Sequence, residues 1–202
     1  MIERPPLILG ISGASGVTYG VRLLELLQSL AVETHLVMTK AAEVTLAHET
    51  QRKVAEVQAL AHHSYAVADI AAPIASGSFR TRGMIIAPCS IRSMSEIAYG
   101  TTSSLLTRAA DVTLKERRPL VLMVRETPLH LGHLRTMTAL AEMGAVIAPP
   151  VPAFYAEPAT LAEMIDHTLG RVLDVFGIEL PGLRRWGESA DEDATLQPLR
   201  RR

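Results

Sequence analysis

The sequence of 202 residues lacks several features that mark particular classes of protein. Its single cysteine, Cys89, excludes an intramolecular disulfide and a cysteine-rich metal site. Its net charge of −1 provides no overall field that would attract nucleic acid or an anionic membrane. No apolar run is long enough to cross a bilayer, and no basic-then-apolar leader opens the chain. We therefore expect a cytoplasmic protein that binds neither nucleic acid nor membrane.

Hydrophobic residues, in contrast, are abundant, at 48% of the chain, and some of this apolar surface is expected to be buried between subunits. Short runs rich in Val, Ile and Leu alternate with stretches of helical periodicity. Runs of this kind are typical of parallel strands that are buried on both faces. The expected strands are 7–10, 34–38, 83–87, 120–124 and 145–148, and the expected helices are 17–30, 41–48, 131–143 and 161–176.

This alternation predicts an α/β fold with a doubly wound parallel sheet, flavodoxin-like or Rossmann-like, in a single domain. The domain is expected to cover residues 1–188 and to be followed by a polar, mobile tail at 189–202. Residues 51–82 are the least regular part of the domain and are expected to form a loop or a cover over a site.

Two loops of small residues follow expected strands. In the first, 10–16 (GISGASG), glycines would let the backbone approach a phosphate, and the next helix would offer unpaired N–H groups, with Ser12 and Ser15 as hydroxyl donors. A tight turn made only for packing is the alternative. In the second loop, after 83–87, Ser90 and Ser93 are placed either to cap a helix or to bind a ligand. Cys89 is expected to be a buried, inert thiol.

Charged residues gather at 108–118 and after the fourth expected strand. Arg108 and Lys115 are seven residues apart, hence on one helix face, and together could hold a phosphate. The alternative is a solvated helix with internal ion pairs, which we prefer for residues 116–118. Arg125 and Glu126 follow the strand 120–124, at the position where α/β sheets carry functional groups.

The histidine pairs do not complete a metal site by their spacing. His130 and His133 lack a third ligand at helical spacing, so core or capping roles are favoured, and His62–His63 is expected to be surface rather than ligand. The sequence contains no aspartate-rich motif that would hold magnesium on a diphosphate. If a phosphorylated substrate is used, cationic side chains must supply the compensating charge, and no metal is expected.

Several motifs in order resemble the UbiX-type flavin prenyltransferases over nearly the whole chain to about Glu188. They are GISGASG at 10–16, ASGS at 75–78, PCS at 88–90, RAADVTLKERRPLVL at 108–122, RETPLHLGHLRTM at 125–137, PPVPAFY at 149–155 and RWGE at 185–188. The resemblance implies a flavodoxin-like fold, assembled as a dodecamer that is built from trimers. It also implies metal-independent alkylation of reduced FMN at N5 and C6 by dimethylallyl phosphate, giving prenylated FMN for a UbiD-type decarboxylase.

The resemblance also implies roles for individual residues. Those at the FMN site would be Gly13, Ala14, Ser15, Thr39, Ser90, Ile91, Arg92, Ser93 and Arg125. Those around the prenyl phosphate would be Arg108, Lys115, Glu126, Tyr155, Arg171 and Trp186, with Tyr155 and Arg171 reaching it across a subunit boundary. The catalytic residues would be Glu49, Lys115, Glu126 and Ser15.

Two departures and two alternatives accompany this interpretation. Thr136 stands where the family often has asparagine, and residues 51–74 align poorly with the family. A flavin-dependent cysteine decarboxylase would need a histidine after the first helix and an asparagine motif; only His48 lies near, and the chain contains no asparagine. An FMN-binding subunit that loads a decarboxylase would need neither Lys115 nor Glu126. The pathway served, ubiquinone biosynthesis or aromatic-acid breakdown, and the choice between monophosphate and diphosphate donor stay open.

Overall fold

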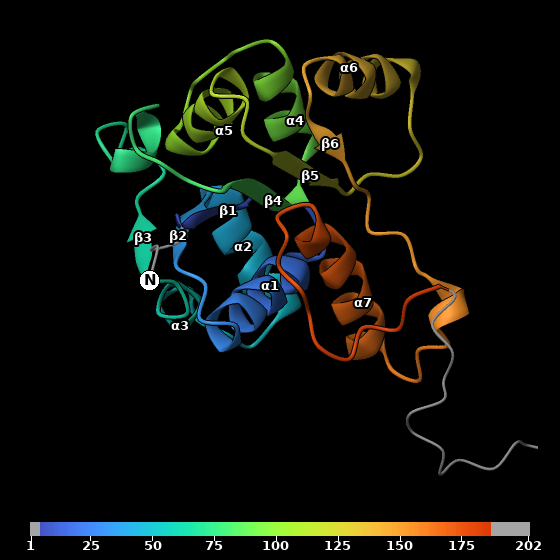
Figure 1. Ribbon diagram of the computed structural model, residues 1–202. Coiled ribbons are helices and arrows are strands. Elements are labelled where there is room, and N and C mark those ends of the chain that lie inside the picture. The colour runs from blue at the N-terminus through green and yellow to red at the C-terminus, as the bar shows by residue number, and fades with distance from the viewer. Residues whose placement is uncertain (1–4, 187–202) are drawn as a thin grey trace, which may run out of the picture.

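A computed structural model describes residues 5–186, so the expected tail at 189–202 and the end of the expected domain at 188 lie outside the described residues. Six parallel strands form one sheet in the order β3-β2-β1-β4-β5-β6 (Figure 1). The strands are β1 Leu7–Ile11, β2 Thr34–Met38, β3 His63–Tyr65, β4 Gly83–Cys89, β5 Leu120–Val124 and β6 Val146–Ile147. Without the short β3, the order is that of flavodoxin; with it, the order is that of the dinucleotide-binding Rossmann sheet.

Helices cover both faces of the sheet. Helices α1, α2, α3 and α7 pack on one face, and α4, α5 and α6 pack on the other (Figure 1). Their bounds are α1 Val17–Ser29, α2 Lys40–Glu49, α3 Val54–Gln58, α4 Ile91–Ala98, α5 Leu105–Lys115, α6 Leu131–Glu142 and α7 Leu161–Asp174, with short 3₁₀ turns η1 Pro73–Ala75 and η2 Phe154–Ala156. Every residue of β1, β2, β4 and β5 is buried, which explains why these strands show no polar alternation.

The predicted doubly wound parallel sheet is confirmed, and three local expectations need correction. Strand β4 does not end at Ala87 but continues to Cys89, because Cys89 pairs with Val124 beyond an irregularity in the register. The segment 51–82 is not without regular structure, since it contains α3, β3 and η1. The last strand, expected at 145–148, pairs only over Val146–Ile147. Among the described residues, no helix combines the length and the apolar character needed to cross a bilayer.

The register of the four central strands positions the site. Ile11 is level with Met38, Gly10 with Ile86, and Cys89 with Val124. The residues that follow these strands therefore emerge at one edge of the sheet; they are Ser12, Thr39, Ser90 and Arg125. The chain leaves β1 and β4 in opposite directions across the sheet, and ligands of open α/β sheets bind in the crevice at such a switch point.

Candidate functional site

Ser12 ties together the two loops that meet at the switch point. Its hydroxyl is fully buried, donates to the Pro88 carbonyl at 2.9 Å and accepts the Ser90 N–H at 2.7 Å. The Ser12 N–H also donates to the Pro88 carbonyl, at 3.2 Å. The sequence suggested that Ser12 offers its hydroxyl to a ligand, and this is wrong because both of its hydrogen-bonding roles are filled within the protein. Ser12 instead fixes the spacing between the glycine loop and the start of α4.

The glycine loop runs beside α2 and can do so only with small residues. A Cβ on Gly13 would lie 2.2 Å from the Cβ of Ala41, so no side chain fits there. Gly16 caps α1 with φ at +93°, a conformation that favours glycine. Ser15 is exposed between them, and Thr39 caps α2 by accepting the Ala42 N–H at 3.1 Å. The loop thus presents backbone and hydroxyl groups at the edge of the sheet.

Glu49 lies at the N-terminus of α1. Its carboxylate accepts the Gly16 N–H at 2.8 Å and the Val17 N–H at 3.0 Å. The sequence predicted unpaired N–H groups here, and for these two groups that prediction is wrong because Glu49 satisfies them. A carboxylate at this position is favoured by the positive end of the helix dipole. The arrangement brings Glu49, from the end of α2, beside the glycine loop that precedes α1.

The start of α4 supplies the second half of the crevice. The Ser90 side chain caps the helix by accepting the Ser93 N–H at 3.2 Å, so the capping alternative is confirmed for Ser90. The Ser90 and Ser93 hydroxyls are 3.2 Å apart. Ile91 and Arg92 form the first turn, and Arg92 points away to Glu96 at 2.9 Å. Hydroxyls and the first-turn N–H groups of a helix are suitable donors for an anionic ligand.

Arg125 and Glu126 follow β5 at the same edge. The Arg125 N–H donates to the Cys89 carbonyl at 3.1 Å, which fixes the backbone, while both side chains are exposed. Within residues 5–186, the Arg125 guanidinium has no ion-pair or hydrogen-bond partner, and Glu126 accepts only the neighbouring Thr127 N–H, at 3.0 Å. Both charged groups are therefore available to a ligand. Cys89 is fully buried, and burial raises the pKa of its thiol to about 12, as expected for an inert thiol.

Arg108 and Lys115 both lie on α5, Arg108 in its first turn and Lys115 at its end. Arg108 donates to the Ala75 carbonyl at 3.2 Å and pairs with Asp111 at 2.7 Å, and Lys115 contacts Glu116 at 2.5 Å. Helix α5 ends at Lys115, shortly before β5 begins, whereas Glu126 follows the other end of β5. One chain therefore keeps Lys115 and Glu126 at opposite ends of a strand, and does not gather them around one phosphate.

Residues 116–118 do not form the solvated helical segment that we preferred. The helix has ended, and Arg117 adopts a positive φ of 55°. Arg118 donates to the carbonyls of Phe79 and Gly77, each at 2.7 Å. Arg118 thereby holds the 77–81 loop against the end of α5, on the side of Lys115.

A third group of expected residues gathers around α7. The ring of Tyr155 makes edge contacts with His167 at 5.4 Å and with Trp186 at 5.5 Å. Tyr155 and Arg171 line a largely apolar cavity of about 310 Å³, and Trp186 is 82% exposed. Among the described residues, no hydrogen bond, ion pair or cavity joins these side chains to the crevice at the switch point or to Arg108 and Lys115 of α5. Within residues 5–186, Tyr155 and Arg171 thus border an apolar cavity, and Trp186 lies beside it through its contact with Tyr155.

Sequence reasoning missed the residue that orients Arg171. Asp174 pairs with Arg171 at 2.7 Å and with Arg185 at 2.8 Å. Arg185, and to a lesser degree Arg171, lowers the pKa of Asp174. The three-residue spacing of Arg171 and Asp174 on one helix was the available signal.

Of the two histidines at the start of α6, His130 takes the capping role that the sequence favours, whereas the Nδ1 of His133 is buried without a hydrogen-bond partner among the described residues. His130 caps the helix by accepting the Gly132 N–H at 3.0 Å, and its ring stacks on His133 at 3.5 Å. Thr136, in place of the family's asparagine, is buried and donates to the Gly132 carbonyl at 2.9 Å. Thr136 is therefore part of the packing of α6 beneath the exposed 125–131 segment.

Comparison with known proteins agrees with this geometry. Residues 1–175 match the model of the Flavoprotein family. The flavin prenyltransferase UbiX of Escherichia coli strain K12 is 62% identical over 176 residues, which cover 87% of this chain and 93% of the relative.

Solved structures agree as well. The crystal structure of AnUbiX (PadA1) in complex with FMN and dimethylallyl pyrophosphate superimposes with a TM-score of 0.90 at 45% identity, covering 93% of this chain and all of that one. A dodecameric FMN-dependent UbiX-like decarboxylase from Escherichia coli O157:H7 has a TM-score of 0.88 at 49% identity, covering 91% of this chain and all of that one. The chain therefore belongs to the Flavoprotein family and, within it, to the UbiX flavin prenyltransferases.

Proposed function

We propose that this chain transfers a dimethylallyl group to N5 and C6 of reduced FMN and delivers the prenylated FMN to a UbiD-type decarboxylase. The observation that carries the proposal is the crevice at the switch point, where Ser12 locks the glycine loop to α4. UbiX relatives at 45–62% identity, one of them solved with FMN and dimethylallyl pyrophosphate, support the same reaction. We place the enzyme in the cytoplasm, as the sequence suggested.

The crevice has the donors and the space that FMN requires. Gly13 lets the glycine loop pack against Ala41 of α2, and the backbone of Ala14 and Ser15 continues the loop at the edge of the sheet. The hydroxyls of Thr39, Ser90 and Ser93 emerge at the same edge, and the first turn of α4 adds the N–H groups of Ile91 and Arg92. The unpaired Arg125 guanidinium provides a positive charge for a phosphate or an electron-rich ring edge. When bound, reduced FMN supplies the nucleophilic atoms N5 and C6.

The site for the prenyl phosphate is completed by more than one chain. Lys115 and Glu126 lie at opposite ends of β5, and the group around Tyr155 and Arg171 is separate from both. Exposed apolar side chains surround these groups, and some are expected to be covered on assembly: Leu129, Leu131, Leu134, Val151, Phe154 and Leu161. We propose a dodecamer like that of the Escherichia coli O157:H7 relative, in which neighbouring chains bring the three groups together.

In such a shared site each residue has a chemical role. Breakage of the allylic C–O bond leaves the electron pair on the phosphate, and Arg108, Lys115 and Arg171 would stabilise that charge without a metal ion. Glu126 would relay the proton that leaves N5 to the departing phosphate. When the second bond forms, the allyl double bond takes up one proton as C6 loses its own, and Glu49, beside the glycine loop, would accept the proton from C6.

The remaining residues shape the environment of the allylic group. The exposed face of Trp186, in edge contact with Tyr155, would stabilise cationic character on the allyl group through its π electrons. The apolar lining of the neighbouring cavity would exclude water and so protect the allyl group from hydrolysis. Ser15, exposed at the tip of the loop, would position the flavin for attack.

Mass spectrometry of the released flavin tests the proposal. The full chain would be incubated without oxygen or added metal, with reduced FMN and either dimethylallyl phosphate or dimethylallyl diphosphate. We expect flavin heavier by one prenyl unit with at least one of the two donors, and the comparison identifies the donor. Unmodified flavin with both donors would instead leave an FMN-binding subunit and refute the catalytic role.

A further inference from the structure

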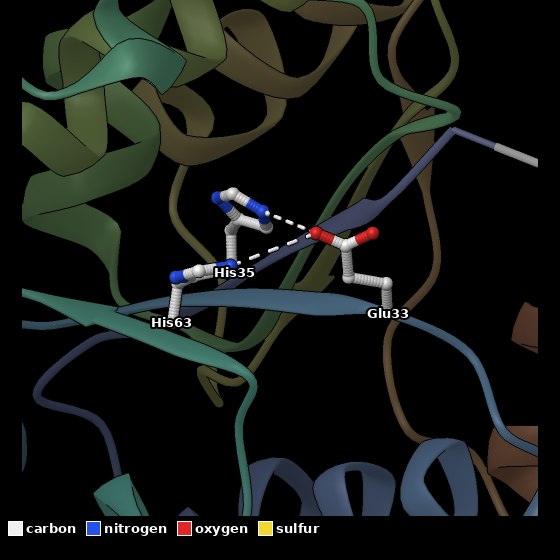
Figure 2. Close-up of side chains that lie close together, drawn as sticks. All are labelled: Glu33, His35 and His63. Carbon is white, nitrogen blue, oxygen red and sulfur yellow. Dashed lines mark hydrogen bonds and ion pairs between the residues drawn. The ribbon is translucent and has the colours of Figure 1, made fainter.

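Three potential metal ligands converge where β2 and β3 begin, at the end of the sheet opposite the flavin crevice. Glu33 precedes β2, His35 is within β2, and His63 is level with His35 on the neighbouring strand β3. The Glu33 Oε1 atom lies 3.2 Å from His35 Nε2 and 3.7 Å from His63 Nε2. Figure 2 draws both contacts as dashed lines. The three ligand atoms all lie within 4.8 Å of one another.

These separations fit a tetrahedral metal ion. Metal–ligand bonds of about 2.0–2.2 Å at tetrahedral angles place neighbouring ligand atoms about 3.4 Å apart. The two distances from Glu33 Oε1 bracket this value. The third separation is between the ligand nitrogens of His35 and His63. The His63 side chain is 55% exposed, so it can rotate to bring its nitrogen closer to that of His35 without disturbing the core. Two imidazoles and a carboxylate form a donor set that suits zinc and neighbouring divalent transition metals.

His35 has the surroundings of an oriented ligand. Its side chain is only 4% exposed, and its second ring nitrogen, Nδ1, lies 2.8 Å from the Tyr65 hydroxyl. The rings of Tyr65 and Phe79 pack on it at 5.6 and 5.2 Å. Metal-bound histidines commonly use the other ring nitrogen for a hydrogen bond that fixes the ring.

We propose that Glu33, His35 and His63 bind a divalent transition metal of the zinc class, with a fourth position open to water. The buried His35 anchors the ion, while the half-buried Glu33 and the exposed His63 complete the site from the surface. The ion would join the three-residue edge strand β3 to β2 and stabilise an edge that backbone pairing alone holds weakly. This site lies apart from the flavin crevice and is independent of the proposed reaction.

Cobalt titration of the full, tag-free chain, stripped of metal with a chelator, tests the site. Co²⁺ serves as the probe because four-coordinate cobalt absorbs visible light, and Zn²⁺ is then added as competitor. We expect a single Co²⁺ per chain, displaced by Zn²⁺. The changes His63→Gln, at an exposed side chain, and Glu33→Gln, at a half-buried one, should weaken binding at least tenfold. Tyr65→Phe should weaken it about tenfold through the lost hydrogen bond to His35.

His48→Gln is the matched control, because His48 is exposed on α2 and belongs to no cluster among the described residues. This variant should bind cobalt as the unchanged chain does. Thermal unfolding with and without Zn²⁺ gives a second measurement, since an ion that binds only the folded chain raises Tm. The proposal is overturned if the unchanged chain binds no Co²⁺, or if His63→Gln and His48→Gln bind it equally well and gain the same Tm with Zn²⁺.

Discussion

Replacing Ser12 by alanine should loosen the junction on which the flavin crevice depends. The Ser12 hydroxyl accepts the Ser90 N–H at 2.7 Å, and alanine offers nothing in its place. The hydrogen bond to the Pro88 carbonyl is partly replaceable, since the Ser12 N–H also donates to it. An N–H left without its partner costs about 1–3 kcal/mol, so we expect a destabilisation of about 2 kcal/mol. For a chain of this length that corresponds to a fall in Tm of about 4–8 °C.

The assay measures both Tm and FMN affinity, at one protein concentration. Because Ser90 starts α4 and caps it, we expect the Kd for FMN to rise about tenfold, which equals about 1.4 kcal/mol. Ser29→Ala is the control: its hydroxyl makes one local bond to Leu26 at the exposed end of α1, so its loss should cost about 0.5 kcal/mol or less. Equal Tm values for the two variants, with FMN affinity unchanged in both, would refute the role of Ser12.

Three further predictions concern other parts of the molecule. Glu126→Gln should lower the rate of prenyl transfer at least tenfold and leave FMN retention nearly unchanged, and an equal loss of both would contradict its proposed role in proton transfer. Cys89, with its pKa raised by burial, should not react with a thiol reagent at pH 8 until the chain unfolds, so rapid labelling of the native protein would count against the fold of β4. Asp174 has a lowered pKa in the folded state, so its stabilising effect is complete above the unfolded value of about 3.9 and is lost as the pH falls through the folded value. Acid unfolding of Asp174→Asn should therefore depend less steeply on pH below about 4 than that of the unchanged chain, and identical profiles would show that its ion pairs contribute nothing.

Much of the crevice could be predicted because its residues directly follow buried strands. Ser12, Thr39, Ser90 and Arg125 each come after an apolar run, and parallel strands bring such positions to one edge. The role of Glu49 could be inferred only from the family. Its partners, Gly16 and Val17, lie more than 30 residues earlier, and nothing local marks the contact.

Other features depend on contacts that no local pattern encodes. Strand β3 is three residues long and mostly exposed, so it carries no apolar signal, and the meeting of His35 with His63 follows only from its pairing with β2. Likewise, the spacing of Arg108 and Lys115 correctly predicts that both lie on one helix. The spacing does not show that α5 packs on the sheet so that Lys115 lies near the start of β5. We propose that these cations meet Glu126 only when chains assemble.

A mixed assembly tests most directly the central claim that neighbouring chains complete one active site. Chains carrying Lys115→Ala and chains carrying Glu126→Gln would be produced separately and together, and prenylated FMN would be measured by mass spectrometry. If the two residues act from different chains, each variant alone is nearly inactive, while random mixing leaves about a quarter of the sites intact and restores about a quarter of the activity. If the mixture stays as inactive as either variant alone, the two residues act within one chain, and the shared site proposed here is wrong.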